Sequence, residues 1–158
     1  MDYPITPAVR ALRAKKIDFA PHLYAYEEHG GTRRSAAELG VDEHAVVKTL
    51  VFETDARKAF IVLMHGDLTV SAKGLARALN VKSVAPCEVE RAQKLTGYMV
   101  GGTSPFGTRT ALPVYAEKSI FELPRIYING GKRGFLVELE PRVLKELLQA
   151  QEVEVGIA

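Results

Sequence analysis

The stretch Thr96–Gly107, TGYMVGGTSPFG, holds four of the thirteen glycines in the chain. An apolar pair runs directly into Gly101-Gly102. Glycine tolerates positive φ and lets a second backbone or a ligand come close, so this pattern is typical of a bulge or a close-approach loop at the end of a strand. Its free N–H groups and the two hydroxyls that follow can hold an anion or a developing oxyanion. The local pattern alone favours the plainer alternative, an ordinary turn between two strands.

Length and composition around this stretch indicate one globular domain over residues 1–158, with 47% hydrophobic and 25% charged residues. The net charge of +2 permits an RNA partner without requiring one. Cys87 is the single cysteine, which excludes an internal disulfide and suits a reducing compartment. Because no apolar run approaches a membrane span and Met1–Arg10 lacks a signal-peptide core, we expect a cytoplasmic protein with no membrane partner.

Upstream of the stretch, the pattern predicts a helix, a strand and a loop. Thr6-Pro7 begins the helix, since a hydroxyl suits the cap and proline the first helical position. Phe19–Tyr26 is typical of a strand, and its proline predicts an edge position. The loop Glu27–Arg34, EEHGGTRR, carries two glycines and a basic pair. Ser35 is then expected to cap a short helix that Gly40 ends.

Two apolar runs further along, Lys48–Glu53 and Ala59–Met64, predict a hairpin. The second run is continuously apolar, as expected of a strand covered on both faces. Period-2 alternation places Lys48 on the same face as Leu50 and Phe52. Two interpretations of Lys48 stay open: a snorkelling lysine at a strand end, which the spacing alone favours, and a cation held at the rim of a pocket.

Downstream of the hairpin, Pro86 is expected to begin a helix with Cys87 in its first turn, where a helix N-terminus can lower a thiol pKa. No histidine lies near Cys87 in the sequence, so we expect a structural thiol rather than a nucleophile. After the glycine stretch, Ala111–Tyr115 is predicted to be a strand.

A second glycine cluster, Gly130–Gly134, lies between the apolar runs Arg125–Asn129 and Phe135–Leu139. A Gly-Gly turn between apolar runs predicts a hairpin. Its tip carries Lys132 and Arg133, and such a basic tip suits a phosphate.

Several familiar site types are missing from the sequence. The four histidines show neither HxH nor HExxH spacing, and there is no Walker A motif, no GxSxG elbow and no paired-carboxylate motif. We therefore expect no metal site and no other cofactor. The absence of a helix-turn-helix signature and the nearly balanced charge argue against a DNA partner.

Four sequence blocks together resemble one family, the YbaK/ProX aminoacyl-tRNA deacylases, whose domain also occurs inserted in bacterial prolyl-tRNA synthetases. The blocks are TPAVRAL (Thr6–Leu12), VVKTLVF (Val46–Phe52), TGYMVGGTSPFG (Thr96–Gly107) and YINGGKRG (Tyr127–Gly134). They occur in the order and at the spacing of the family and cover nearly all of the chain. The resemblance implies a single α+β domain with a large mixed, curved sheet and peripheral helices.

The resemblance also implies an activity, the hydrolysis of the ester in mischarged tRNA, above all tRNA(Pro) that carries a wrong small residue. Lys48 and the loop of Gly101 and Gly102 would be catalytic, since a tetrahedral oxyanion needs preorganised donors. Members that act on Cys-tRNA(Pro) are thought to use the substrate's own thiol as nucleophile. The expected substrate-binding residues are Tyr24, Thr49, Thr103, Ser104, Asn129, Gly130, Gly131 and Leu136, and the expected tRNA contacts are Arg33, Arg34, Lys132 and Arg133.

Two positions depart from the family pattern. Cysteine-deacylating relatives have Ser and Asp where this chain has Asn129 and Leu136. The missing carboxylate indicates a more apolar pocket that could prefer alanine or 2-aminobutyrate over cysteine. We therefore expect a trans-editing deacylase that acts on tRNA(Pro) carrying cysteine or another small residue such as alanine or 2-aminobutyrate, with mischarged tRNA(Pro) and prolyl-tRNA synthetase as its partners. The alternative is a non-catalytic module that binds aminoacyl-tRNA or a nucleotide.

Overall fold

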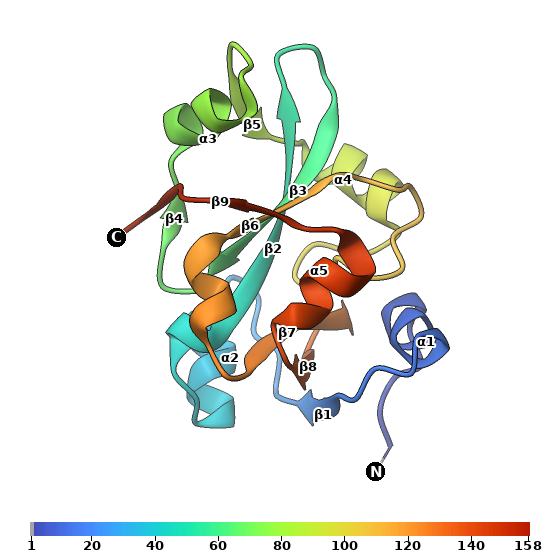
Figure 1. The fold of residues 1–158 in the computed structure, drawn as a ribbon. Helices are drawn as coiled ribbons and strands as arrows, with labels where there is room; N and C mark the ends of the chain where they lie inside the picture. Colours follow the sequence, from blue (N-terminus) through green and yellow to red (C-terminus); the bar gives the residue numbers. More distant parts are fainter. Residues whose placement is uncertain (1) are drawn as a thin grey trace.

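The computed structural model describes residues 2–158 and has a mixed seven-strand path at its centre, with β5 attached beside it (Figure 1). The path runs in the order β1-β8-β7-β2-β3-β6-β9. The pairs β2–β7, β3–β6 and β6–β9 are parallel and the other pairs are antiparallel. The strands are β1 (Ala20–Leu23), β2 (Val46–Thr54), β3 (Ala59–His65), β6 (Val114–Glu117), β7 (Ile126–Lys132), β8 (Phe135–Leu139) and β9 (Gln151–Val153).

Strand β2 is the central strand, and one of its two edges is divided between two partners. Along the other edge it pairs with β3 from Val47 to Glu53. On the divided edge β7 pairs only with the first two residues of β2, and β5 (Val84–Pro86) pairs only with the last three. Backbone groups alternate between the two edges of a strand. The Val51 carbonyl accepts the Cys87 N–H (2.9 Å) on the β5 side. Thr49 lies two residues earlier in the strand, so its N–H and C=O point to the same edge, into the gap between β7 and β5.

Helices surround this sheet, and their ends follow the capping rules. They are α1 (Pro7–Ala14), α2 (Gly31–Leu39), α3 (Ala72–Leu79), α4 (Val89–Thr96) and α5 (Arg142–Leu148), with 3-10 turns η1 (Glu43–Ala45) and η2 (Lys118–Glu122). The Thr6 hydroxyl accepts from the Val9 N–H, and Gly40 ends α2 in the left-handed conformation, as predicted. A small second sheet pairs β4 (Thr69–Val70) with β10 (Gly156–Ile157).

The two faces of β8 show how the chain divides its apolar residues. Phe135, Val137 and Leu139 are fully buried in the larger core, which α1 and α5 cover. Leu136 points to the opposite face, where it packs with Ala36 of α2 and Val46 of β2. The hairpins β2–β3 and β7–β8, the buried strand β3 and the edge position of β1 were all predicted and are confirmed. The α+β class with a mixed sheet is also confirmed.

Four local predictions were wrong. The glycine stretch does not end a strand, because Met99 and Val100 lie in an exposed turn after α4. Cys87 precedes α4 rather than lying in its first turn. Ser35 lies inside α2, which begins four residues earlier. The strand expected at Ala111–Tyr115 begins only at Val114.

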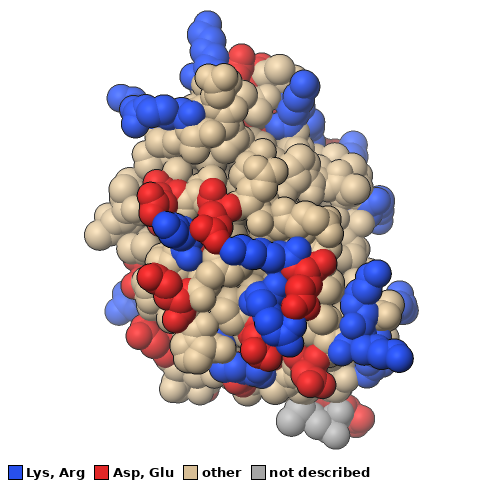
Figure 2. All heavy atoms as spheres, in the orientation of Figure 1, with Lys and Arg blue, Asp and Glu red and all other residues tan. Residues whose placement is uncertain are grey.

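Surface charge is mixed on the face seen in Figure 1. Figure 2 shows Lys and Arg interspersed with Asp and Glu there, rather than gathered into a patch of one sign. Over residues 2–158, no helix has both the length and the apolar character needed to cross a membrane.

Candidate functional site

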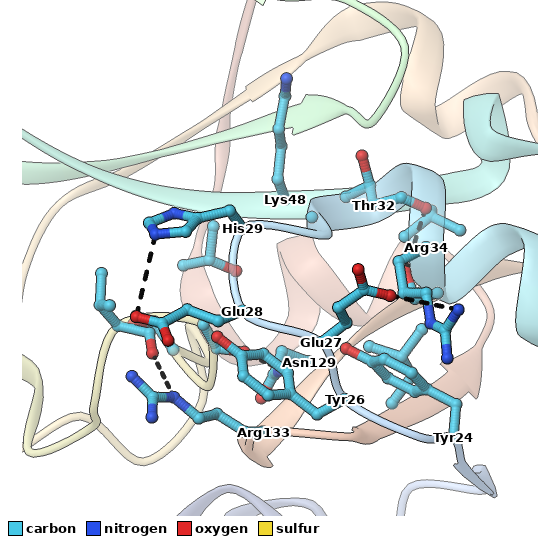
Figure 3. A pocket seen from close by; sticks show the side chains of 18 of the residues that line it. Tyr24, Tyr26, Glu27, Glu28, His29, Thr32, Arg34, Lys48, Asn129 and Arg133 are labelled. Carbon is cyan, nitrogen blue, oxygen red and sulfur yellow. Dashed lines mark hydrogen bonds and ion pairs between the residues drawn. The ribbon is translucent and has the colours of Figure 1, made fainter.

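A cavity of about 360 Å³ opens at the divided edge of β2 (Figure 3). Its walls are Val46–Leu50 of β2, the chain from Tyr24 into α2, the turn at Val100-Gly101, and the β7–β8 hairpin. Ligand cavities commonly span roughly 300–1,000 Å³ and combine apolar walls with a few polar groups. The volume and lining fit a small ligand group.

Lys48 supplies a cation to this cavity that the protein does not neutralise. Within residues 2–158 its ammonium forms neither an ion pair nor a hydrogen bond. Partial burial lowers the pKa of Lys48, and the more distant carboxylates of Glu43 and Asp67 offset part of that effect. Figure 3 shows the side chain extending away from Tyr24, Tyr26 and Asn129. An ammonium in this state can polarise a carbonyl or hold an anion.

The glycine loop comes very close to other parts of the chain, as predicted. A Cβ at Gly101, which has φ +86°, would lie 2.6 Å from the Tyr26 hydroxyl. At Gly102 it would lie 2.7 Å from the backbone nitrogen of Arg133. The Gly102 N–H donates to the Met99 carbonyl (2.9 Å), whereas the N–H groups of Gly101 and Thr103 have no acceptor within the described chain. Among the residues of this loop that line the cavity, Gly101 and Thr103 therefore keep a free N–H.

Asn129 joins the hairpin to the glycine loop. Its Oδ1 accepts from the N–H groups of Gly131 (2.7 Å) and Lys132 (3.1 Å), where the ladder between β7 and β8 is irregular. Its Nδ2 donates to the Gly101 carbonyl (3.2 Å). The side chain thus fixes the orientation of the turn at residues 100–102, and it does so from a position that lines the cavity.

Two of the four basic residues expected to contact tRNA are already engaged within the protein. Arg34 makes ion pairs with Glu27 and Glu38, both at 3.3 Å, and its Nε donates to the Ala25 carbonyl. Arg133 donates to the Val100 carbonyl (2.8 Å), and its guanidinium lies over the Tyr26 ring. Both side chains hold loops that border the cavity. Arg33 and Lys132 are exposed and do not line it.

The apolar wall of the cavity is formed by Leu136, which is 4% exposed, together with Val46 and Tyr24. Burial raises the pKa of Tyr24, which keeps its hydroxyl protonated. The Thr49 hydroxyl is buried and has no hydrogen-bond partner within the described residues. A buried polar atom without a partner is costly, so this hydroxyl is a natural contact for a ligand.

The structure brings most of the expected site residues together. Those that line the cavity are Tyr24, Arg34, Lys48, Thr49, Gly101, Thr103, Asn129, Arg133 and Leu136. Those that do not are Gly102, Ser104, Gly130, Gly131, Arg33 and Lys132. Ser104 is fully buried and caps the Phe106 N–H, and Gly130 packs against Phe135. Gly102, Gly130 and Gly131 allow close packing at the hairpin rather than lining the cavity.

Sequence reasoning missed the turn Glu27–Gly30, which also lines the cavity apart from its last residue. The only signal for it was the pair of glycines in EEHGG. A second missed feature is the proximity of His44, His65 and Asp67, whose ligand atoms lie within 4.8 Å of one another. Spacing motifs could not reveal this group because it is assembled from separate segments. Both ring nitrogens of His65 are already bonded, to the His44 carbonyl and the Ser119 hydroxyl, each at 2.7 Å.

Cys87 does not line the cavity. Burial and the neighbouring Glu53 carboxylate raise the pKa of its thiol to about 11. A protonated thiol is a poor nucleophile, so Cys87 is not a nucleophile for this cavity.

Comparisons with known proteins relate the chain to a family. Residues 28–147 match the model of the aminoacyl-tRNA editing domain. The chain is 28% identical over 151 residues to EbsC of Enterococcus faecalis, proposed to be a Cys-tRNA(Pro)/Cys-tRNA(Cys) deacylase, and the match covers 95% of this chain and 92% of EbsC. It is 28% identical to the proline–tRNA ligase of Caldicellulosiruptor bescii, over 80% of this chain but only 20% of the ligase.

Solved structures share the fold over nearly the full length. The hypothetical protein APE2540 has a TM-score of 0.87 at 23% identity, covering 96% of this chain and 99% of that one. A structure described as a proposed trans-editing enzyme for prolyl-tRNA synthetase has a TM-score of 0.83 at 23% identity, covering 98% of this chain and 100% of that one.

Proposed function

The chain belongs to the aminoacyl-tRNA editing domain family, and on this premise we propose that it hydrolyses the ester of tRNA(Pro) charged with a wrong small amino acid. The observation that carries the proposal is one cavity lined by Lys48, which has no ion pair, by Gly101 and Thr103, whose N–H groups have no acceptor in the described chain, and by the apolar wall at Leu136. These are the parts that ester hydrolysis of a small aminoacyl group needs.

The proposed chemistry is stabilisation of a tetrahedral oxyanion. Removing one such donor commonly costs 10²–10³-fold in rate, about 2.7–4 kcal/mol. Lys48 would polarise the ester carbonyl, while the N–H groups of Gly101 and Thr103 would receive the developing negative charge. Gly102, whose own N–H is used within the loop, would act by allowing the hairpin to approach.

The proposed specificity follows from Leu136. A leucine side chain cannot hold or deprotonate a thiol, and together with Val46 it offers an apolar surface. We therefore place alanine and 2-aminobutyrate ahead of cysteine as the residue removed. One methylene in an apolar pocket separates substrates by only about 10–200-fold, which is why synthetases that confuse small residues need a second check. Prolyl-tRNA synthetase would supply the mischarged tRNA.

The proposed tRNA contacts are Arg33 and Lys132, which are exposed and make no ion pair in the described chain. Arg34 and Arg133 would serve the loops instead. Affinity for the acceptor end should fall with salt, with a slope of roughly −0.7 per phosphate neutralised on a single strand.

The test is a deacylation panel. The purified protein is incubated with tRNA(Pro) charged separately with alanine, 2-aminobutyrate, cysteine, serine or proline, and the released amino acid is measured. We expect release from the alanyl and 2-aminobutyryl species and none from Pro-tRNA(Pro). Binding without release from any species would support the non-catalytic alternative and refute the proposal.

A further inference from the structure

We propose that His29 is the general base that activates the hydrolytic water. The inference rests on the proposed function, because it assigns the proton transfer that ester hydrolysis at this cavity requires. A small apolar aminoacyl group brings no nucleophile of its own, and Cys87 lies elsewhere. Water must then attack, and a water molecule attacks an ester far faster when a side chain takes its proton.

His29 occupies an unusual backbone position at the edge of the cavity. It is the third residue of a turn closed by the Gly30 N–H and the Glu27 carbonyl (2.9 Å), and its φ is +64°. Residues other than glycine seldom adopt this conformation. Glycines follow at the next two positions, where a Cβ at Gly30 would lie 2.7 Å from the Cβ of Arg34. The turn therefore keeps a histidine where its backbone would favour glycine.

Arg34 anchors this turn to α2. Its guanidinium pairs with the Glu27 carboxylate and donates to the Ala25 carbonyl, both at 3.3 Å. In Figure 3 the His29 ring lies between Lys48 and Glu28, at the open mouth of the cavity, where its side chain is 92% exposed. The Glu28 carboxylate lies 3.8 Å from His29 Nε2, where it would stabilise the imidazolium formed after proton transfer.

The other three histidines are committed to protein partners. His22 bonds the Glu138 carboxylate (2.8 Å), His44 bonds Asp67 (2.9 Å), and His65 bonds a carbonyl and a hydroxyl. Only the His29 ring makes no hydrogen bond within residues 2–158, and only this ring lines the cavity. It is the one imidazole free to accept a proton there.

The proposed step balances as follows. A neutral His29 nitrogen takes one proton from water while the water oxygen bonds to the ester carbonyl carbon. The tetrahedral intermediate collapses, the bond between that carbon and the ribose oxygen breaks, and the imidazolium returns its proton to the ribose oxygen. The products are the free amino acid and tRNA with a free ribose hydroxyl.

Because the base must be neutral to accept a proton, activity should fall at acidic pH. The other groups that face His29 across the cavity are Glu27, Glu28, Arg34, Lys48 and Arg133, together with Tyr24 and Tyr26. Among these side-chain types, only an imidazole ordinarily changes charge between pH 5 and 8. If the fall in activity at acidic pH disappears when His29 is replaced, His29 is the group responsible for that fall.

The experiment uses two variants that suit the backbone. Asparagine and glycine both tolerate positive φ, so His29→Asn and His29→Gly should melt no lower than the parent. We expect each to lower kcat/KM for the best substrate of the panel about 10²-fold or more, with the pH dependence below neutrality lost. His22→Asn, which removes an imidazole outside the cavity, is the matched control and should keep the parental profile.

Chemical rescue separates a base from a structural side chain. His29→Gly leaves an open space at a solvent-exposed turn, so added imidazole should restore part of the rate, and should not do so in a Lys48→Ala/His29→Gly double variant. If the parent hydrolyses a substrate but His29→Asn keeps its rate and pH profile, the assignment of His29 is overturned alone. If the parent hydrolyses no aminoacyl-tRNA, the proposed function falls and the assignment falls with it.

Discussion

Replacing Lys48 should separate activity from stability. The Lys48 ammonium has no bonded partner in the described chain, so its removal breaks no ion pair and orphans no buried acceptor. What Lys48→Ala does remove is three methylenes at about half burial, about 1.2 kcal/mol at roughly 0.8 kcal/mol per methylene. In a chain of this length that corresponds to a melting temperature lower by about 2–5 °C.

Lys48→Met is the matched variant, since it keeps an unbranched stem of similar length without the charge. It should melt at or above the parental temperature, because it removes the cost of partly burying a charge, the same effect that lowers the pKa of Lys48. Both variants should lose about 10²–10³-fold in deacylation rate, the scale for one oxyanion donor.

Single-turnover deacylation with enzyme in excess measures the chemical step, and a thermal melt of the same preparations measures stability. A Lys48→Met protein that melts normally and deacylates at the parental rate would remove Lys48 from the mechanism. A melting temperature many degrees lower would instead show that the ammonium has a structural partner.

Three further predictions concern the cavity wall, the free thiol and the glycine loop. Leu136→Asp should raise the ratio of kcat/KM for Cys-tRNA(Pro) over Ala-tRNA(Pro), while Leu136→Met should keep the parental ratio; a parent that cleaves only the cysteinyl species would contradict this interpretation of Leu136. Cys87→Ala should keep full activity, and because the pKa of Cys87 is about 11 against a usual 9.0, its alkylation by iodoacetamide at pH 8 should be about 100-fold slower than that of a free thiol and should accelerate as the pH rises. Gly102→Ala should destabilise the protein by about 1–3 kcal/mol in a denaturant titration, since its Cβ would meet backbone atoms of the hairpin rather than a movable side chain. In Gly101→Ala the Cβ would meet only the tip of the Tyr26 side chain, so the main cost there is the positive φ.

Much of the fold was predictable because its signals are local. The cap at Thr6, the left-handed end at Gly40 and the two hairpins each depend on a few neighbouring residues. The continuous apolar run of β3 indicated directly that both faces of this strand are buried. The parallel pairing of β2 with β7 joins residues about 80 positions apart, and nothing in either segment specifies the other.

The site was predictable in part, because the family resemblance led us to expect Lys48 and Gly101 at one pocket and both line the cavity, while their catalytic roles stay predictions. It was not predictable where a side chain has two uses. Arg34 and Arg133 look like phosphate ligands in the sequence, yet both hold loops through backbone carbonyls. In the sequence, His29 lies in a loop marked by two glycines and a basic pair, and only the structure shows that it lines the cavity.

The gap between β7 and β5 also gives this protein a built-in spectroscopic reporter. Amides locked in a ladder exchange their hydrogens slowly, whereas one that lacks an acceptor exchanges readily. The Thr49 amide faces the gap, flanked by paired residues of the same strand. Its hydrogen should therefore exchange fast in the middle of a slowly exchanging strand. When a ligand fills the cavity, its resonance should shift and its hydrogen exchange should slow. One amide signal would then report occupancy of the site without any label on the RNA.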